Sequence, residues 1–275
     1  AGEFGATSLD LFGRSYPVTG VAGDQQAAVV GQACFQPGAI KSTYGTGAFI
    51  LANAGPEMPD PAPGVLATVA YRLAGKATYA VEGAIFNAGT AMKWMRDDLG
   101  IVSDVGETAR IAASLPDNAG VYLIPAFTGL GAPWWDPDAR GAIFGLTRDV
   151  GPAHLVRAAL EAVAYQTADM LDAMAPDALT VLRVDGGMVA NDWLMQFLAD
   201  ILDLPVERPV VQETTAFGAA CLAGLGAGRI GGLEEIVADW HLDRRFEPRM
   251  AAATRGGLLD RWRALVERTR ESRPA

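Results

Sequence analysis

Cysteine and histidine are nearly absent from this sequence of 275 residues, which contains two of each. Cys34, Cys221, His154 and His241 are scattered along the chain, and their spacing matches no zinc site. We therefore expect no metal ligands among these side chains. Both cysteines stand among small apolar residues, a context typical of reduced, buried packing residues in a cytoplasmic protein.

Lysine is also scarce, and positive charge is in deficit overall. The sequence has only three lysines, Lys41, Lys76 and Lys93. Against 22 basic residues there are 32 acidic ones, which gives a formal net charge of −10. Such a chain repels phosphate backbones, so we expect no nucleic-acid binding. The nine arginines from Arg244 onward are interleaved with acidic residues, which indicates a solvated or subunit-facing helix.

Long apolar runs and the common nucleotide-binding motifs are missing as well. No run approaches the roughly 18 apolar residues that indicate a membrane span. The sequence has no Gly-x-x-x-x-Gly-Lys-Ser/Thr phosphate loop and no Gly-x-Gly-x-x-Gly fingerprint after a predicted strand. It also lacks a Gly-x-Ser-x-Gly elbow and the protein-kinase Asp-Phe-Gly set. A disordered chain is excluded, because 50% of the residues are hydrophobic.

The order of apolar patterns predicts an α/β layered domain, with strands first and then strands alternating with helices. The clearest predicted helix covers residues 152–174, and a small-residue helix over 215–226 must pack closely against a neighbour. We divide the chain into a connector at residues 1–19, one domain at 20–230 and a helical tail at 231–275. Since the sequence begins without Met, we expect a fragment whose natural start lies upstream.

An acidic residue at a predicted helix start is the first candidate for chemistry. Residues 23–26 read Gly-Asp-Gln-Gln ahead of a small-residue run. Asp24 is suited to accept a proton from a substrate hydroxyl, and the Gln25 amide is suited to bind a second hydroxyl. The alternative interpretation is an aspartate that only caps a helix.

Two glycine-rich turns are compatible with phosphate or a flat base. In the first, Gly45 and Thr46 stand in the sequence Thr-Tyr-Gly-Thr-Gly, where backbone N–H groups can approach phosphate oxygens. In the second, Gly187 follows a predicted strand and Asn191 begins the next helix. The alternatives are an ordinary hairpin turn and an ordinary strand-to-helix turn.

Two further candidates lie one helical turn apart. Gly89 and Lys93 share a face of a predicted helix over 87–99. A solvated lysine is the alternative reading of Lys93. Phe49, just after the first glycine-rich turn, is either a core residue or the wall of a small pocket.

These segments, in this order, resemble the C-terminal half of the FGGY carbohydrate kinases, and in particular the members that phosphorylate glycerol. The resemblance extends from about residue 20 to residue 230. It is carried by VAGDQQAA at 21–28, STYGTG at 42–47, EGAIF at 82–86, PAFTGLGAPWWDP at 125–137, the whole of 141–165 and VDGG at 184–187.

The resemblance implies an actin-like (ribonuclease H-like) ATPase domain, two of which close over ATP and substrate. It also implies transfer of the γ-phosphoryl group of ATP, with Mg²⁺, to a primary hydroxyl of glycerol, giving glycerol 3-phosphate. No metal ligand in this chain is implied. Asp24 becomes the general base, Gln25 binds glycerol and Phe49 packs on its carbon skeleton. The nucleotide contacts implied are Gly45, Thr46, Gly89, Lys93, Gly187 and Asn191, although the family commonly has Gln at position 93.

The implied partners are glycerol or a related polyol and an N-terminal domain that this sequence lacks. The full-length protein is then expected to be a homodimer or homotetramer, and the fragment alone to be inactive. Two alternatives remain: an FGGY kinase for xylulose, ribulose or gluconate, and a non-catalytic actin-like nucleotide-binding module.

Overall fold

The computed structural model describes residues 1–174 and 179–272. Its centre is a seven-stranded sheet with the order β11-β10-β9-β3-β4-β6-β5. The strands are β3 (Ile40–Tyr44), β4 (Ala48–Gly55), β5 (Leu66–Leu73), β6 (Lys76–Ile85), β9 (Leu182–Asp185), β10 (Val206–Pro209) and β11 (Leu242–Phe246). Strands β3, β9 and β10 run parallel, and the other neighbours pair antiparallel.

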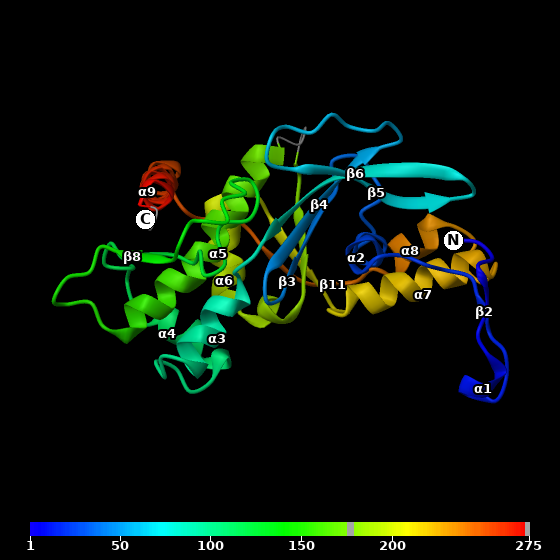
Figure 1. The fold of residues 1–275 in the computed structure, drawn as a ribbon, viewed down its shortest axis with the longest axis horizontal. Helices are drawn as coiled ribbons and strands as arrows, with labels where there is room; N and C mark the ends of the chain where they lie inside the picture. Colours follow the sequence, from blue (N-terminus) through cyan, green and yellow to red (C-terminus); the bar gives the residue numbers. More distant parts are fainter. Residues whose placement is uncertain (175–178, 273–275) are drawn as a thin grey trace.

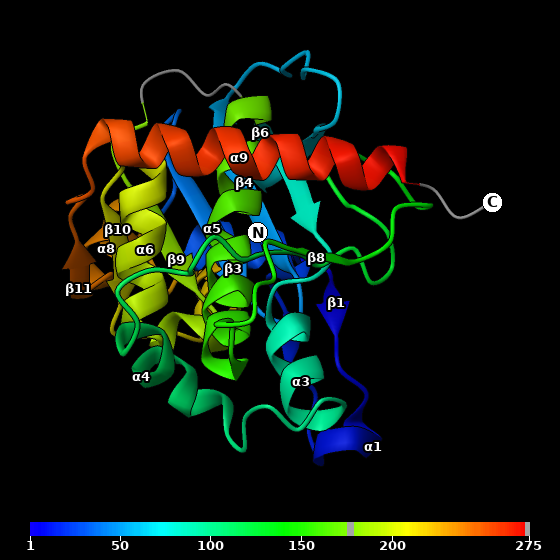
Figure 2. The same ribbon diagram turned by 90° about the vertical axis from the view of Figure 1, so that its left-hand side faces the viewer.

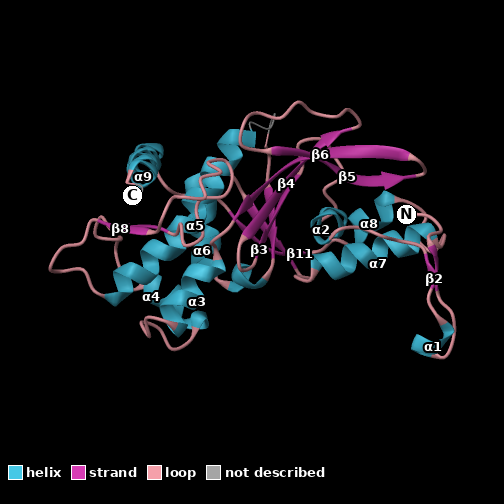
Figure 3. Ribbon diagram, viewed as in Figure 1, coloured by secondary structure: helices cyan, strands magenta, loops and turns pink. Residues whose placement is uncertain are grey.

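Helices cover both faces of the sheet, which gives three layers (Figures 1 and 3). One face carries α2 (Asp24–Gly31), α7 (Thr214–Gly226) and α8 (Leu233–Asp239), and the other carries α5 (Pro152–Met174) and α6 (Asp192–Leu202). The remaining helices are α3 (Gly89–Asp97), α4 (Thr108–Ala113) and α9 (Ala252–Glu271), with 3-10 turns η1 (Val105–Glu107) and η2 (Gly187–Ala190). The predicted α/β layering is confirmed.

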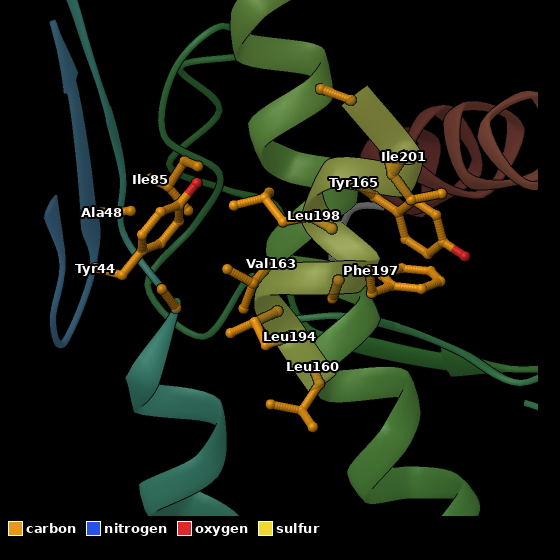
Figure 4. Close-up of a cluster of buried hydrophobic side chains, with 14 of the residues drawn as sticks. Tyr44, Ala48, Ile85, Leu160, Val163, Tyr165, Leu194, Phe197, Leu198 and Ile201 are labelled. Carbon is orange, nitrogen blue, oxygen red and sulfur yellow. The ribbon is translucent and has the colours of Figure 1, made fainter. Parts of the chain in front are cut away.

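Alternation along the central strands divides the apolar residues between the two faces. On β4, Ile50 joins the large cluster under α5 and α6, whereas Leu51 packs with Val29 of α2. Figure 4 shows Val163 of α5 and Leu198 of α6 in the large cluster, facing strands of the sheet. The sheet is therefore packed against helices on both faces.

The small-residue helix α7 packs against α2, as its composition predicts. A Cβ atom built on Gly218 would lie 1.8 Å from the carbonyl oxygen of Ala27, and one on Gly31 would lie 2.0 Å from that of Thr214. The two backbones therefore touch, and only glycine fits at these two points.

The chain after residue 230 adds a strand and a long helix to the same core, in addition to the helical tail predicted there. Strand β11 pairs with β10 at the edge of the sheet. Helix α9 lies across the outer side of α5 and α6 (Figure 2). Its Trp262 is 1% exposed and donates from Nε1 to Oδ2 of Asp169 on α5 over 2.7 Å. Burial raises the pKa of Asp169 to about 6.

The first nineteen residues begin and end against the layered body, where Ala1 donates to the Arg72 carbonyl and Thr19 to the Ala223 carbonyl, and their middle part extends away from it (Figure 1). They contain the short strands β1 (Gly5–Ala6) and β2 (Pro17–Val18), which pair antiparallel, with α1 (Leu9–Phe12) between them. A second small sheet, β7 (Tyr122–Ile124) with β8 (Ala142–Phe144), lies beside α5. No helix in the described part of the chain combines the length and apolar character that a bilayer crossing needs.

Candidate active site

The candidate site lies where the parallel strands β3 and β9 end side by side. Thr43 of β3 is in register with Asp185 of β9, so the turns after both strands emerge at the same edge. In open α/β sheets, ligands bind at the carboxyl ends of such strands. Gly186 has φ +90°, and a Cβ there would lie 2.5 Å from the carbonyl oxygen of Tyr44. Glycine is therefore required for the two strand ends to meet.

The turn after β3 packs directly on the start of α3, which brings three predicted nucleotide residues together. Gly89 N–H donates to the Gly45 carbonyl over 3.0 Å, and Thr90 N–H and Oγ1 both donate to the Thr46 carbonyl over 3.0 Å. A Cβ on Gly89 would lie 2.5 Å from that Gly45 oxygen. This close approach alone requires glycine at position 89. Gly45 and Thr46 remain exposed, and Lys93 is exposed one turn further along α3.

A largely apolar cavity of about 310 Å³ opens beside this turn. It is lined by Met92, Val105, Gly106, Thr108, Ala109, Leu160, Gly187, Met188, Ala190 and Asn191. Gly187 is exposed, and nothing lies within 4 Å of a Cβ built on it. A flat aromatic ring fits against such a surface without steric conflict.

Asn191 has the capping geometry that its position predicts. Its Oδ1 accepts from Leu194 N–H over 2.9 Å at the start of α6, and its Nδ2 donates to Thr108 Oγ1 over 3.2 Å. Both polar groups of the amide are therefore used inside the protein. Thr108, which the sequence analysis did not single out, belongs to the cavity wall through this bond.

Asp24 is the first residue of α2, and its carboxylate is exposed at the same edge of the sheet. Its Oδ1 accepts from Gln25 N–H over 2.9 Å, and its Oδ2 accepts from Gln25 Nε2 over 3.2 Å. Gly23, not Asp24, occupies the N-cap position. The alternative of a helix-capping aspartate is therefore not observed: the carboxylate accepts from an N–H of the first turn without being the N-cap, and it still faces solvent.

A second cavity, of about 330 Å³, adjoins Gln25 and Phe49. It is lined by Gln25, Gln26, Phe49, Leu66, Glu82, Gly83, Ala84 and Trp135. Phe49 is 43% exposed, which excludes the core position that the sequence left open and leaves its ring as a wall. Trp135, whose Nε1 donates to the Gly64 carbonyl over 2.8 Å, forms another part of the wall.

Lys41 is a buried residue beside the candidate site to which its sequence position assigns no role. It lies on β3, is 0% exposed, and its Nζ donates to Gln25 Oε1, to Thr43 Oγ1 over 2.9 Å and to the Phe49 carbonyl over 3.5 Å. Burial lowers the pKa of Lys41 to about 8, although Asp185 and other nearby acidic groups oppose the shift. Because Lys41 lies in a strand, the sequence around it does not predict its contact with Gln25 of α2.

Glu82 is a second residue of the candidate site to which the sequence alone assigned no role. It lies in the wall of the Phe49 cavity, and burial raises the pKa of its carboxyl, while the charge of Lys41 opposes that shift. The cavity therefore combines an aromatic wall with a carboxyl and an amide, a combination suited to a small hydroxylated molecule.

Among residues 1–174 and 179–272, no group of three His, Cys, Asp or Glu side chains is arranged to hold a metal ion. The buried Asp185 carboxylate already accepts from Gln32 Nε2 over 2.8 Å and from Thr214 Oγ1 over 2.7 Å. A Mg²⁺ ion at this edge would depend mainly on phosphate oxygens and water, which is its usual mode with nucleotides.

Comparison with known proteins gives consistent matches. The C-terminal domain model of the FGGY family of carbohydrate kinases matches residues 40–227. The chain is 58% identical over its full length to a curated glycerol kinase of Rhodospirillum centenum, and it covers 55% of that protein. The structure of Plasmodium falciparum glycerol kinase with ADP superposes with a TM-score of 0.85 at 38% identity, covering 92% of this chain and 51% of that one. A xylulose kinase from Rhodospirillum rubrum gives a TM-score of 0.78 at 26% identity, covering 97% and 55%.

The chain thus spans about half the length of the relatives that it matches. The structural neighbours confirm the actin-like fold that the resemblance implies. The matched domain covers most of the described layers, from β3 to α7. The chain therefore belongs to the FGGY family of carbohydrate kinases and contains its C-terminal domain.

Proposed function

We propose that this chain is the C-terminal half of an ATP-dependent kinase that converts glycerol to glycerol 3-phosphate. The observation that carries the proposal is the 58% identity to a glycerol kinase over the whole chain, which also contains the cavity lined by Gln25 and Phe49. A 330 Å³ cavity lined by aromatic rings, two amides and a carboxyl group suits a three-carbon triol.

Asp24 acts in this proposal as the general base. Its exposed carboxylate accepts the proton of the attacking primary hydroxyl and orients that oxygen toward the phosphoryl group. Gln25 binds a second hydroxyl, and the Phe49 ring packs on the carbon skeleton. In phosphoryl transfer most of the rate comes from positioning and charge stabilisation, so these three residues need fixed places more than unusual basicity.

The nucleotide side consists of the two glycine turns and the apolar cavity. The exposed Gly45 and Thr46 hold phosphate oxygens, and Gly187 lets the base or ribose lie on the backbone. Gly89 fixes the approach of α3 to this turn, and Asn191 shapes the cavity through α6 and Thr108. Lys93, at a position where Gln is common in the family, reaches a phosphate or ribose oxygen from α3.

ATP with Mg²⁺ is the proposed phosphoryl donor. When bound, the ion neutralises phosphate charge, and this chain contributes backbone and hydroxyl donors around it and no dedicated metal cage. The sequence has no Gly-x-x-x-x-Gly-Lys-Ser/Thr loop, in which a lysine would contact the phosphates, so the phosphate contacts in this chain are assigned to backbone N–H groups and hydroxyls.

An N-terminal domain of the same protein completes the proposed site. The relatives are nearly twice as long as this chain, which covers 55% of the first of them. We expect the full-length protein to be a homodimer or homotetramer. A cytoplasmic location is consistent with Cys34 and Cys221, which are both unpaired and buried.

A coupled ADP-release assay on the full-length protein tests the function. Glycerol is compared with xylulose, ribulose and gluconate, and the 275-residue chain alone serves as the reference for the missing half. Activity confined to glycerol and close triols is expected, with none from the chain alone. Preference for a sugar or sugar acid overturns the glycerol assignment, and inactivity toward every compound favours a nucleotide-binding module without catalysis.

The role of Asp24 has a matched control. We expect Asp24→Asn to lower kcat at least about 100-fold and to leave ATP affinity unchanged, because the carboxylate acts on the acceptor hydroxyl. Asp10→Asn removes another exposed first-turn acid, on α1, and is expected to change neither value. Full activity of Asp24→Asn would refute the assignment.

A further inference from the structure

Lys41 is a buried cation whose three acceptors are neutral. Its side chain is 0% exposed, and its Nζ donates to Gln25 Oε1, Thr43 Oγ1 and the Phe49 carbonyl. It forms no ion pair with a carboxylate within the described residues. Burying an unpaired ammonium is costly, and an apolar residue of similar volume is generally more favourable for stability. Stability therefore gives no reason for a lysine here.

The contacts of Lys41 fix the direction of the Gln25 amide. An ammonium group has donors and no acceptor, so the amide atom that faces it must be the oxygen. The amide nitrogen then points the other way, toward Oδ2 of Asp24, with a separation of 3.2 Å. A continuous chain of hydrogen bonds runs from β3 through Gln25 to the exposed carboxylate.

The same ammonium group holds the wall of the cavity. Thr43 pairs with Phe49 across β3 and β4, and Lys41 contacts the side chain of the first and the carbonyl of the second. Gln25 reaches this point from α2, a different layer of the fold (Figure 1). The Nζ atom of Lys41 therefore contacts both the Gln25 amide and the backbone of Phe49, whose ring forms the aromatic wall of the cavity.

We infer that Lys41 is a positioning residue of the polyol site, holding the Gln25 amide and the Phe49 backbone in the geometry that presents a substrate hydroxyl to Asp24. The inference rests on the proposed function. It does not make Lys41 a catalytic residue, because its Nζ is enclosed by protein atoms and acts through Gln25 and Phe49.

A double-mutant cycle in the full-length protein tests the inference. Lys41→Met, Gln25→Ala and the double variant are compared for kcat/KM of glycerol and KM of ATP. We expect Lys41→Met to lower kcat/KM for glycerol roughly 10- to 100-fold and to leave KM for ATP within about twofold, since small misplacements of reacting groups have large effects on rate. In the Gln25→Ala background, the same change should have an effect of less than about threefold, because the two residues act in one chain.

Lys76→Met is the matched control, because Lys76 is an exposed lysine at the start of β6 and has no place in the site. It should leave both kinetic values unchanged. A merely structural role for Lys41 would lower the active fraction equally for both substrates and give independent effects in the cycle, and that result overturns the inference. If Lys41→Met does not fold, Lys41→Gln, which keeps a shorter donor, replaces it in the cycle with the same criteria.

Different results would overturn the glycerol assignment and the positioning role of Lys41. Wild-type enzyme that phosphorylates a different polyol overturns the glycerol assignment, and the cycle is then decided on that polyol. Wild-type enzyme that phosphorylates glycerol, with independent effects of Lys41 and Gln25, overturns only the positioning role.

Discussion

The contact between α2 and α7 is the most demanding backbone contact of the fold, and Gly218→Ala tests it. The added methyl group would lie 1.8 Å from the Ala27 carbonyl oxygen and 2.7 Å from the Gly31 nitrogen. Real Cβ atoms essentially never approach another heavy atom closer than 3.0 Å. Both neighbours are backbone atoms of a buried helix, so no side chain can rotate away. Helix α2 must move.

The size of the effect follows from two opposing terms. Overpacking of a well-packed interior costs about 1–3 kcal/mol, and a rigid backbone on both sides puts Gly218→Ala at the upper end. Replacing glycine by alanine inside a helix returns about 1 kcal/mol. The net loss of about 2 kcal/mol lowers Tm by roughly 4–8 °C for a chain of this size.

Thermal and urea unfolding followed by circular dichroism measure this loss. Gly256→Ala in α9 is the control, because nothing lies within 4 Å of a Cβ built there, and it should stabilise the protein by about 1 kcal/mol. A Gly218→Ala protein with a Tm equal to or above that of the wild type would refute the account of α2 and α7.

Two pH-dependent predictions concern buried ionisable groups. Since burial lowers the pKa of Lys41 from 10.5 to about 8, the unfolded chain binds more protons between these values, and wild-type stability should rise relative to Lys41→Met from pH 8 to 10.5, by at most about 3 kcal/mol. Urea unfolding of both proteins across this range measures it, and parallel curves contradict the shift. Trp262→Phe removes the indole donor to Asp169, whose pKa burial raises to about 6. Losing a hydrogen bond to the ionised carboxylate costs about 1.5–3 kcal/mol, and the cost should be larger at pH 8 than at pH 5, where protonation relieves it. Equal losses at both pH values would exclude an ionised Asp169 partner.

Much of the fold could be predicted from the sequence, because most helices, strands and turns depend on residues that are close together in the chain. The helix expected over 152–174 is observed as Pro152–Met174, and the two glycine turns stand at strand ends as expected. Alternation and turn residues suffice for such elements. Strand β11 was missed because its pattern is charged, Leu-Asp-Arg-Arg-Phe, as suits an exposed edge.

The candidate site could be predicted only in part. Asp24, Gln25 and the glycine turns stand out in the sequence because acidic, amide and glycine residues cluster at predicted strand and helix ends. Lys41 carries none, since a lysine in a strand usually points to solvent. Its importance arises from a tertiary contact between β3 and α2, which no local pattern encodes.

Strand β3 connects the proposed glycerol cavity to the proposed phosphate-binding turn within a few residues. Lys41 and Thr43 are hydrogen-bonded to each other behind the Phe49 wall of the cavity, and Gly45 and Thr46 follow in the turn beside α3. The Lys41 ammonium group lies level with Thr43 and Phe49, so at about 3.3 Å per residue it lies roughly 10 Å or less along the strand from the turn at Gly45 and Thr46. The proposed base, Asp24, is carried by α2, which packs closely against α7 at Gly218. A shift of α2 therefore moves Asp24 while the turn at Gly45 and Thr46 stays fixed on β3 and α3.

In the full-length protein, Gly218→Ala should lower kcat with glycerol about 10- to 100-fold and leave ATP affinity unchanged, because in-line transfer tolerates little misplacement. Equal losses of both would mean that α2 and the phosphate turn move as one unit.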